Sequence, residues 1–282
     1  MRIHHLNCIS ACPLGGLIMD GMTRQVRGRL ASHCLLVEAR DGLVLVDTGY
    51  GLQDVDAPRA RLSSFFLALV KPELREEMTA IRQIQALGFR PADVRHIVLS
   101  HLDFDHAGGL DDFPHARVHL LESEARAASA QQTWLDRQRY RPAQWSTSGG
   151  WQTYAARGEP WRGFDCVREL VGLPPEILLV PLLGHTFGHA GIAIDHGQGW
   201  LFYAADAYFY HAELAARPYC TPGLRFYQRM MEKDRTLRLS NQARLRELAH
   251  TSDDVRIFCA HDVREFEAVS GRPLHEAARS AH

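Results

Sequence analysis

Four side chains of the kinds that bind metal ions lie within six residues of one another, directly after a short apolar segment. The segment 97–99, Ile-Val-Leu, is followed by His101, Asp103, Asp105 and His106. Alternate residues of an extended chain point to the same side, so the first three can converge, and a turn at Asp105 can bring His106 to the same place. Two imidazoles and two carboxylates at the end of a buried strand would lose hydration or repel one another, which costs free energy unless a cation pairs with them. We therefore predict a metal site here rather than an ordinary polar loop.

The same pattern recurs at four other places, where an apolar segment ends and a potential ligand follows. These segments span 42–46, 176–183, 200–205 and 255–260, and the residues that follow them are Asp47, His185, Asp206 and His261. Strand ends form a common rim in a sheet, so these positions can meet. Taken alone, each of these residues could be an ordinary turn aspartate or a capped histidine in a loop. Their occurrence after five separate strands indicates that they form one site.

Strand and helix patterns alternate around these residues. We expect hairpins over 32–47 and 192–205, and helices over 73–87, 122–130, 225–231, 235–250 and from 263 onward. Residues 51–72 are a candidate flap over the site. Residues 131–165 hold four of the five tryptophans, and such an aromatic insertion suits a lid or a dimer contact equally well.

Composition and charge limit the partners. Of the 282 residues, 46% are hydrophobic and 23% charged, and the formal net charge is −1, as in an ordinary globular protein. No basic block is present, which argues against nucleic acid as the partner.

The N-terminus lacks the apolar core of a signal peptide, and no apolar run is long enough to span a bilayer, so we expect a cytoplasmic protein with no membrane partner. The six cysteines include no CxxC pair and are expected to be reduced and mostly buried.

The ordered set of motifs resembles the metallo-β-lactamase-fold hydrolases, and within them the lactonase-like branch. The resemblance spans about residues 3–262 and includes an Asp-Thr-Gly at 47–49, a Gly-His-Thr at 184–186, Asp206 and His261. The family signature is His-x-His-x-Asp-His, whereas this chain has His-x-Asp-x-Asp-His over 101–106. Asp103 is thus a departure from the family pattern.

The resemblance implies an α/β fold, an αββα sandwich of two mixed sheets flanked by helices, as a single domain over 1–282 with an insertion at about 131–165. It also implies a centre of two divalent metal ions. One ion would be held by His101, Asp103 and His185, the other by Asp105, His106 and His261, and Asp206 would bridge them. Asp47 and His189 would support these ligands from behind. Zinc is the first candidate, while the carboxylate of Asp103 leaves iron or manganese open.

The implied chemistry is hydrolysis of a lactone or carboxylic ester by a hydroxide that bridges the two ions. Asp105 would orient this nucleophile and carry its proton, and Tyr208 or Tyr210 would donate a hydrogen bond to the developing oxyanion. Lactonases of this fold often have a tyrosine three residues after the bridging aspartate, where this chain has Phe209.

The leading substrate is a small molecule resembling an acyl-homoserine lactone, and a homodimer is possible. The alternatives are an iron-dependent oxidoreductase of the same fold, which rests on Asp103, a hydrolase of phosphotriesters or thioesters, and a metal-binding scaffold without catalysis. A nuclease is disfavoured by the neutral charge.

Overall fold

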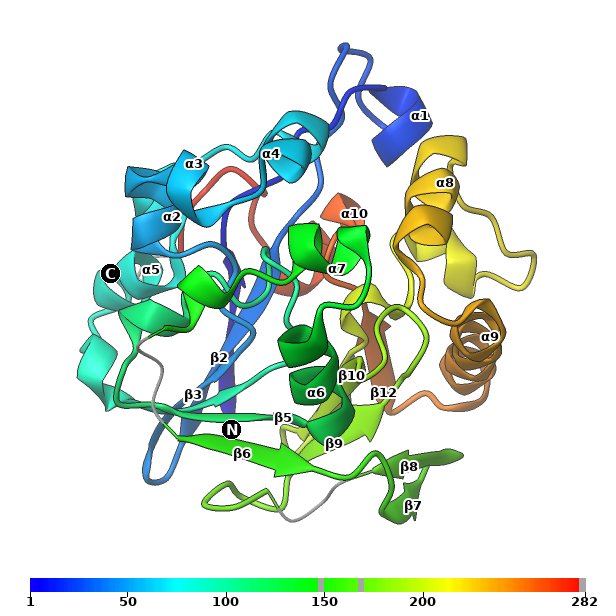
Figure 1. Ribbon diagram of the computed structural model, residues 1–282. Helices are drawn as coiled ribbons and strands as arrows, with labels where there is room; N and C mark the ends of the chain where they lie inside the picture. Colours follow the sequence, from blue (N-terminus) through cyan, green and yellow to red (C-terminus); the bar gives the residue numbers. More distant parts are fainter. Residues whose placement is uncertain (147–149, 167–169, 279–282) are drawn as a thin grey trace.

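Two β-sheets packed face to face form the frame of the computed structural model, which describes residues 1–146, 150–166 and 170–278 (Figure 1). The first sheet has the strand order β1-β2-β3-β4-β5-β6, and its strands from β3 to β6 are parallel. The second has the order β12-β11-β10-β9, in which only β11 and β12 form a parallel pair. A small sheet pairs β7 with β8. The strands are β1 (Arg2–Asn7), β2 (His33–Ala39), β3 (Gly42–Val46), β4 (Val94–Val98), β5 (Arg117–Leu121), β6 (Trp151–Tyr154), β7 (Glu159–Trp161), β8 (Phe164–Cys166), β9 (Ile177–Pro181), β10 (Ala190–Asp195), β11 (Trp200–Tyr203) and β12 (Val255–Phe258).

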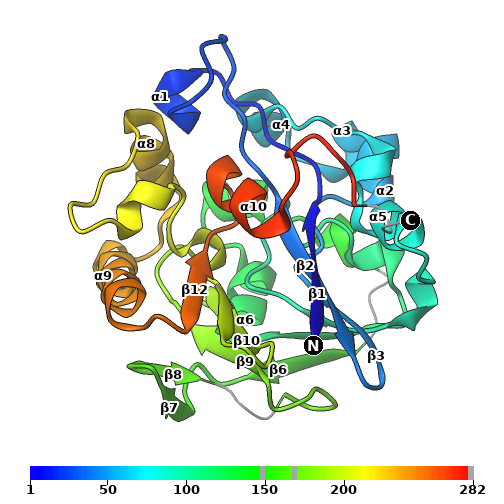
Figure 2. The same cartoon turned by 180° about the vertical axis from the view of Figure 1, so that it is seen from behind.

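Helices cover the outer faces of both sheets (Figures 1 and 2). The α-helices are α1 (Leu17–Asp20), α2 (Leu52–Asp56), α3 (Pro58–Arg61), α4 (Ser64–Val70), α5 (Ala80–Ala86), α6 (Glu122–Ala130), α7 (Trp134–Arg139), α8 (Pro222–Met231), α9 (Arg235–Thr251) and α10 (Val263–Ser270). The short 3-10 helices are η1 (Glu76–Met78), η2 (Pro91–Asp93), η3 (Leu110–Asp112), η4 (Pro142–Gln144), η5 (Ala205–Ala207) and η6 (His211–Leu214).

The apolar residues of the strands alternate between two layers of core, as the two-residue period of a strand requires. In β3, Val44 and Val46 pack in the layer between the sheets, while Leu43 and Leu45 join the layer under α5. In β9, Leu178 and Val180 pack with residues of α9 on the other outer face. This order of helix, sheet, sheet and helix confirms the predicted αββα sandwich.

Two segments differ from the expected elements. The helix expected over 73–87 is shorter, because Thr79 has extended backbone angles that separate η1 from α5, and Gly88 ends the segment with a φ of +88°. Residues 131–165, expected to be an insertion, contain elements that join the sandwich. Strand β6 pairs in parallel with β5 and so adds a strand to the first sheet, and α7 lies beside α4. The candidate flap over 51–72 folds into α2, α3 and α4.

The described part of the chain contains no helix that is long and apolar enough to cross a membrane. The cysteines whose side chains are described, at 8, 12, 34, 220 and 259, are free and buried. The side chain of Cys166 lies outside the described part, so its predicted state stays a prediction.

Candidate metal centre

The ends of five strands meet at one edge of the sandwich. Strands β3 and β4 are parallel, so Asp47 and the segment 101–106 follow them at the same edge. Strands β11 and β12 are parallel, and β9 has the same direction because it is separated from β11 by the antiparallel β10. His185, Asp206 and His261 therefore follow their strands at a common edge as well. The topology brings together all the predicted ligands.

The first cluster consists of His101, Asp103, His185 and Asp206, all buried. Nε2 of His185 lies 3.2 Å from Oδ2 of Asp103 and 3.3 Å from Oδ2 of Asp206. Nε2 of His101 lies 3.4 Å from the same oxygen of Asp103 and 3.8 Å from that of Asp206. Ligands at typical zinc bond lengths around a tetrahedral ion lie about 3.3 Å apart, so these donor atoms have suitable spacing.

The second cluster consists of Asp105, His106 and His261, and Asp206 again contributes. Oδ1 of Asp206 lies 3.1 Å from Nε2 of His261 and 3.2 Å from Nε2 of His106. Oδ2 of Asp105 lies 3.8 Å from Nε2 of His261. The two oxygens of Asp206 thus face different clusters, which is the position that a bridging ligand requires.

Several of these ligand atoms lie close together but do not form hydrogen bonds with one another. Nε2 of His101, Nε2 of His106 and Oδ1 of Asp206 are buried and lack a hydrogen-bond partner within the described residues. Such atoms are rare in folded proteins, and each calls for an explanation such as an ion. Histidine and aspartate are also the ligands that suit zinc and other first-row divalent metals. The residues therefore fit a metal centre.

Three histidines are held so that Nε2 is the atom presented to the clusters. Nδ1 of His106 lies 2.8 Å from Oδ2 of Asp47, and Nδ1 of His261 donates to the carbonyl oxygen of Ala31 at 2.7 Å. Nδ1 of His101 lies 2.9 Å from Oγ of Ser100. With its proton on Nδ1, each neutral ring keeps a lone pair on Nε2, and such contacts orient metal-binding histidines.

Asp47 connects several of these supports. It accepts hydrogen bonds from the amide and hydroxyl of Ser100 at 2.7 and 2.6 Å, and from the hydroxyl of Tyr203 at 2.9 Å. His189 accepts the backbone N–H of Asp206 at 3.0 Å through Nε2, and its Nδ1 donates to the carbonyl of Leu182 at 2.9 Å. Asp47 and His189 thus each contact a candidate ligand through a hydrogen bond, and their supporting role stays a prediction.

The charges of the centre depend strongly on one another. Burial lowers the pKa of His106, but Asp206 and Asp47 outweigh this and hold that pKa well above its usual value. Burial raises the pKa of Asp206, but His261, His106 and His185 hold it well below its usual value. The carboxylate and the imidazoles thus stabilise one another's charged forms, a role that a bound cation would take over.

The two tyrosines predicted to stabilise an oxyanion have other surroundings. The buried hydroxyl of Tyr208 donates to the carboxylate of Glu265 at 2.8 Å. The ring of Tyr210 packs against His211 and Tyr219, and its hydroxyl lies beside Gly21. Neither tyrosine lines the apolar cavity at the centre. The structure thus gives no support to either tyrosine as the oxyanion donor.

Two residues of the centre were not predicted from the sequence. Tyr227 of α8 lines the cavity that reaches Asp105 and His261. Burial, together with the charges of the nearby Asp105, Asp103 and Asp206, raises the pKa of Tyr227 well above its usual value, so the phenol keeps its proton. Arg139, the last residue of α7, forms a buried ion pair with Asp103. Neither has a sequence signal, because both come from segments outside the family motifs.

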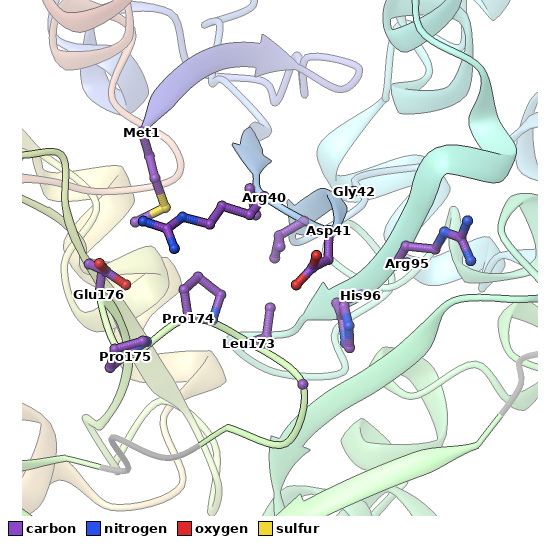
Figure 3. Close-up of a pocket in the computed structure, with 13 residues that line it drawn as sticks. Met1, Arg40, Asp41, Gly42, Arg95, His96, Leu173, Pro174, Pro175 and Glu176 are labelled. Atoms are coloured by element: carbon purple, nitrogen blue, oxygen red, sulfur yellow. The ribbon is translucent and has the colours of Figure 1, made fainter.

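The cavity at the centre has a volume of about 220 Å³ and an almost entirely apolar wall. Its lining includes the candidate ligands Asp105 and His261 together with Leu30, Leu69, Phe226 and Met230. A larger cavity of about 500 Å³ lies at the opposite ends of β3, β4 and β9 (Figure 3). It is lined by residues such as Arg40, Asp41 and His96 and by none of the candidate ligands, so the smaller cavity is the one that adjoins the candidate metal centre.

Comparisons with known proteins agree with this geometry. The family model described as metallo-beta-lactamase superfamily matches residues 27–261. A probable metallo-hydrolase of Mycobacterium tuberculosis is 40% identical over 264 residues, which are 93% of this chain and 80% of that protein. An N-acyl homoserine lactonase of Bacillus cereus is 31% identical over 102 residues, 36% of this chain and 41% of the lactonase.

Solved structures show the same fold. An N-acyl homoserine lactone hydrolase with the product N-hexanoyl-L-homoserine bound at its catalytic metal centre is similar with a TM-score of 0.71 and 22% identity, over 97% of both chains. A dizinc quorum-quenching lactonase is similar with a TM-score of 0.58 and 18% identity, over 93% of this chain and 89% of that one. At these identities the similarity concerns the fold.

Proposed function

The chain belongs to the metallo-beta-lactamase superfamily and is a metal-dependent hydrolase, and on this basis we propose that it hydrolyses lactones or carboxylic esters, with an N-acyl homoserine lactone as the leading candidate. The observation that carries this proposal is the apolar cavity whose lining includes Asp105 and His261 of the candidate metal centre. A substrate with an apolar chain and a polar carbonyl at one end would match both parts of this site. The partial similarity to an N-acyl homoserine lactonase supports the same substrate class.

We propose that two divalent ions bind, with the ligands predicted from the sequence: His101, Asp103 and His185 for the first ion, Asp105, His106 and His261 for the second, and Asp206 for both. Bound divalent ions would polarise the substrate carbonyl and lower the pKa of a water molecule. Zinc is the first candidate, because imidazole and carboxylate ligands both suit it.

Asp105 is the proposed proton carrier. It is the carboxylate among the cavity-lining residues, so a substrate in the cavity lies beside it. Burial raises its pKa, although His106 and His261 oppose this effect. As a proposed ligand that also lines the cavity, it would lie between the bound water and the substrate, which suits it to accept a proton and return it to the leaving alkoxide.

Tyr227 is the proposed hydrogen-bond donor to the developing oxyanion. Its ring lies beside that of Phe209, with centroids 5.7 Å apart, and Phe209 in turn stacks on His261 at 4.9 Å. This packing fixes the ring next to the ligands. Because the phenol keeps its proton, it can donate at neutral pH.

The alternative of an iron-dependent oxidoreductase rests on Asp103, whose added negative charge would favour a harder metal. In the structure, Arg139 compensates that charge, and this observation favours the hydrolase. Phosphotriesters and thioesters are the alternative substrates. A cytoplasmic location and a homodimer stay predictions from the sequence.

Turnover by metal-loaded protein tests the proposal. A panel of acyl-homoserine lactones of different chain length, aryl esters, phosphotriesters and thioesters is assayed before and after removal of metal by a chelator. We expect lactones to be turned over fastest, with activity lost on chelation and restored by Zn²⁺. Absence of lactone and ester hydrolysis, with oxygen uptake by the iron-loaded protein instead, would overturn the proposal.

A further inference from the structure

Arg139 is a fully buried arginine at the edge of the first cluster. Its Nε and Nη2 atoms each lie 2.6 Å from an oxygen of Asp103, so the two residues form a bidentate ion pair. Nη1 donates to the carbonyl oxygen of Met231 at 2.8 Å. Nη2 also lies 2.9 Å from Nε2 of His185. A guanidinium cannot lose its proton in a protein, so this site holds a permanent positive charge.

The ion pair compensates for the departure from the family motif. An aspartate in place of a neutral histidine adds one negative charge, and Arg139 adds one positive charge, so the pair is neutral as an imidazole is. The pairing also orients the carboxylate. Oδ1 of Asp103 accepts from Nε of Arg139, while Oδ2 accepts from Nη2 of Arg139 and also faces Nε2 of His101 and Nε2 of His185. Asp103 thus presents one oxygen to the cluster.

Arg139 also opposes a cation in the first cluster. Its charge lies within hydrogen-bond distance of two of the four candidate ligands, Asp103 and His185. The guanidinium can only donate, so Nε2 of His185 must accept with the lone pair that a metal ion would use. In the second cluster, His106 pairs with Asp47 and Asp206, and His261 pairs with Asp105 and Asp206. These pairs contain no arginine or lysine, in contrast to the pair of Asp103 with Arg139.

We propose that Arg139 is a positioning residue that pairs with Asp103 to replace the imidazole of the family motif and makes the first cluster the weaker of two metal sites. The inference rests on the metal centre of the proposed function and not on its substrate. Its test measures metal binding alone, so failure of lactone hydrolysis leaves it unaffected, and the two failures are distinguishable.

Titration of metal-free protein with Zn²⁺ in a calorimeter tests the proposal. We expect two binding steps whose affinities differ by about tenfold or more, since a charge a few ångströms from the ion has a large effect in a buried site. His185→Ala should remove the weaker step, and His261→Ala the tighter one. Two equal steps, or loss of the tighter step in His185→Ala, would overturn the proposal.

Arg139→Gln removes the positive charge while keeping a hydrogen-bonding side chain. We expect its weaker step to tighten by about tenfold or more, because the charge of Asp103 is then available to the ion. Arg61→Gln is the matched control, since Arg61 is also buried and paired, with Asp54 and Asp111, but contacts no candidate ligand. Loss of the weaker step in Arg139→Gln, with the control unchanged, would contradict the proposal.

A second pair of variants keeps the test decisive if Arg139→Gln folds poorly. In D103H the guanidinium loses its carboxylate partner and should weaken the first site further. In the double variant D103H/R139Q the cluster has a neutral imidazole and no opposing charge, so the weaker step should recover by about tenfold or more relative to D103H. Electron paramagnetic resonance of the Mn²⁺-loaded proteins reports occupation of both sites independently, as a spin-coupled signal. Equal binding by D103H and the double variant would overturn the proposal.

Discussion

Nδ1 of His106 lies 2.8 Å from Oδ2 of Asp47, two residues that are 59 positions apart in the sequence. The contact links the end of β3 to the loop after β4 and points the other nitrogen of the ring toward Oδ1 of Asp206, 3.2 Å away. Asp47 itself has a positive φ of 52°, an uncommon conformation for a residue other than glycine. Such strain is kept where the surroundings hold it, and here it directs the carboxylate at the ligands.

Replacement of Asp47 by asparagine is therefore expected to weaken metal binding. The amide keeps nearly the same shape but loses the charge that holds the Nδ1 proton of His106, and removal of such a partner typically costs about 10- to 100-fold in metal affinity. Calorimetric titration with Zn²⁺ measures the loss. The exposed Asp253→Asn is the control, and equal affinities of the two variants would show that Asp47 does not support the centre.

Tyr227→Phe is expected to lower kcat for lactones by about 100-fold with little change in KM, because an oxyanion donor acts mainly in the transition state. Tyr208→Phe separates this assignment from the sequence-based prediction. That variant loses only a hydrogen bond to Glu265, so it should lower stability by about 1 kcal/mol and leave kcat unchanged. A fall in kcat in Tyr208→Phe and none in Tyr227→Phe would reverse the assignment.

Met230→Trp is expected to shorten the range of acyl chains that the enzyme accepts. Met230 lines the cavity of about 220 Å³, and a larger ring there takes up space that a long chain would fill. KM should rise about tenfold for a ten-carbon acyl chain and little for a four-carbon one. Steady-state kinetics with the two lactones measures the ratio, and an equal change for both would place the acyl chain elsewhere.

The stability of the protein is expected to fall in mild acid, in part because of His119. Burial lowers the pKa of this histidine from 6.5 to about 3, and the neighbouring His96 and Arg117 add to the effect. The folded chain keeps the ring neutral while the unfolded chain takes up a proton below pH 6.5. This contribution is therefore present above pH 6.5 and is lost progressively as the pH falls toward 3.

His119 should contribute about 2 kcal/mol to the loss of stability between pH 6.5 and pH 5. Urea unfolding of wild-type protein and of His119→Gln at both values measures this contribution, since the variant lacks the titrating ring. The free energy of unfolding should depend less steeply on pH in the variant. Equal pH dependence in both proteins would show that His119 is not the source.

The sequence predicted the residues that follow strands, because strand direction and topology bring such positions to one edge. Asp47, Asp206 and His261 could be placed in this way from apolar segments alone. The sequence could not predict Arg139, which reaches Asp103 from 36 positions away in a segment without a recognisable pattern. It could not predict Tyr227 either, because the position of α8 over the cavity depends on packing among distant segments. The break at Thr79 was likewise not apparent, since the apolar spacing there suits one continuous helix.

The amount of Zn²⁺ bound by wild-type protein and by Asp206→Asn tests the central claim most directly. Asp206 faces both clusters, with one oxygen toward each. We predict that metal-free wild-type protein binds two ions per chain at saturating Zn²⁺, and that the variant, with both sites impaired, binds each ion at least about tenfold more weakly. Wild-type protein that binds no Zn²⁺, or a variant that binds two ions as tightly as wild type, would contradict the proposal that these distant segments form one metal centre.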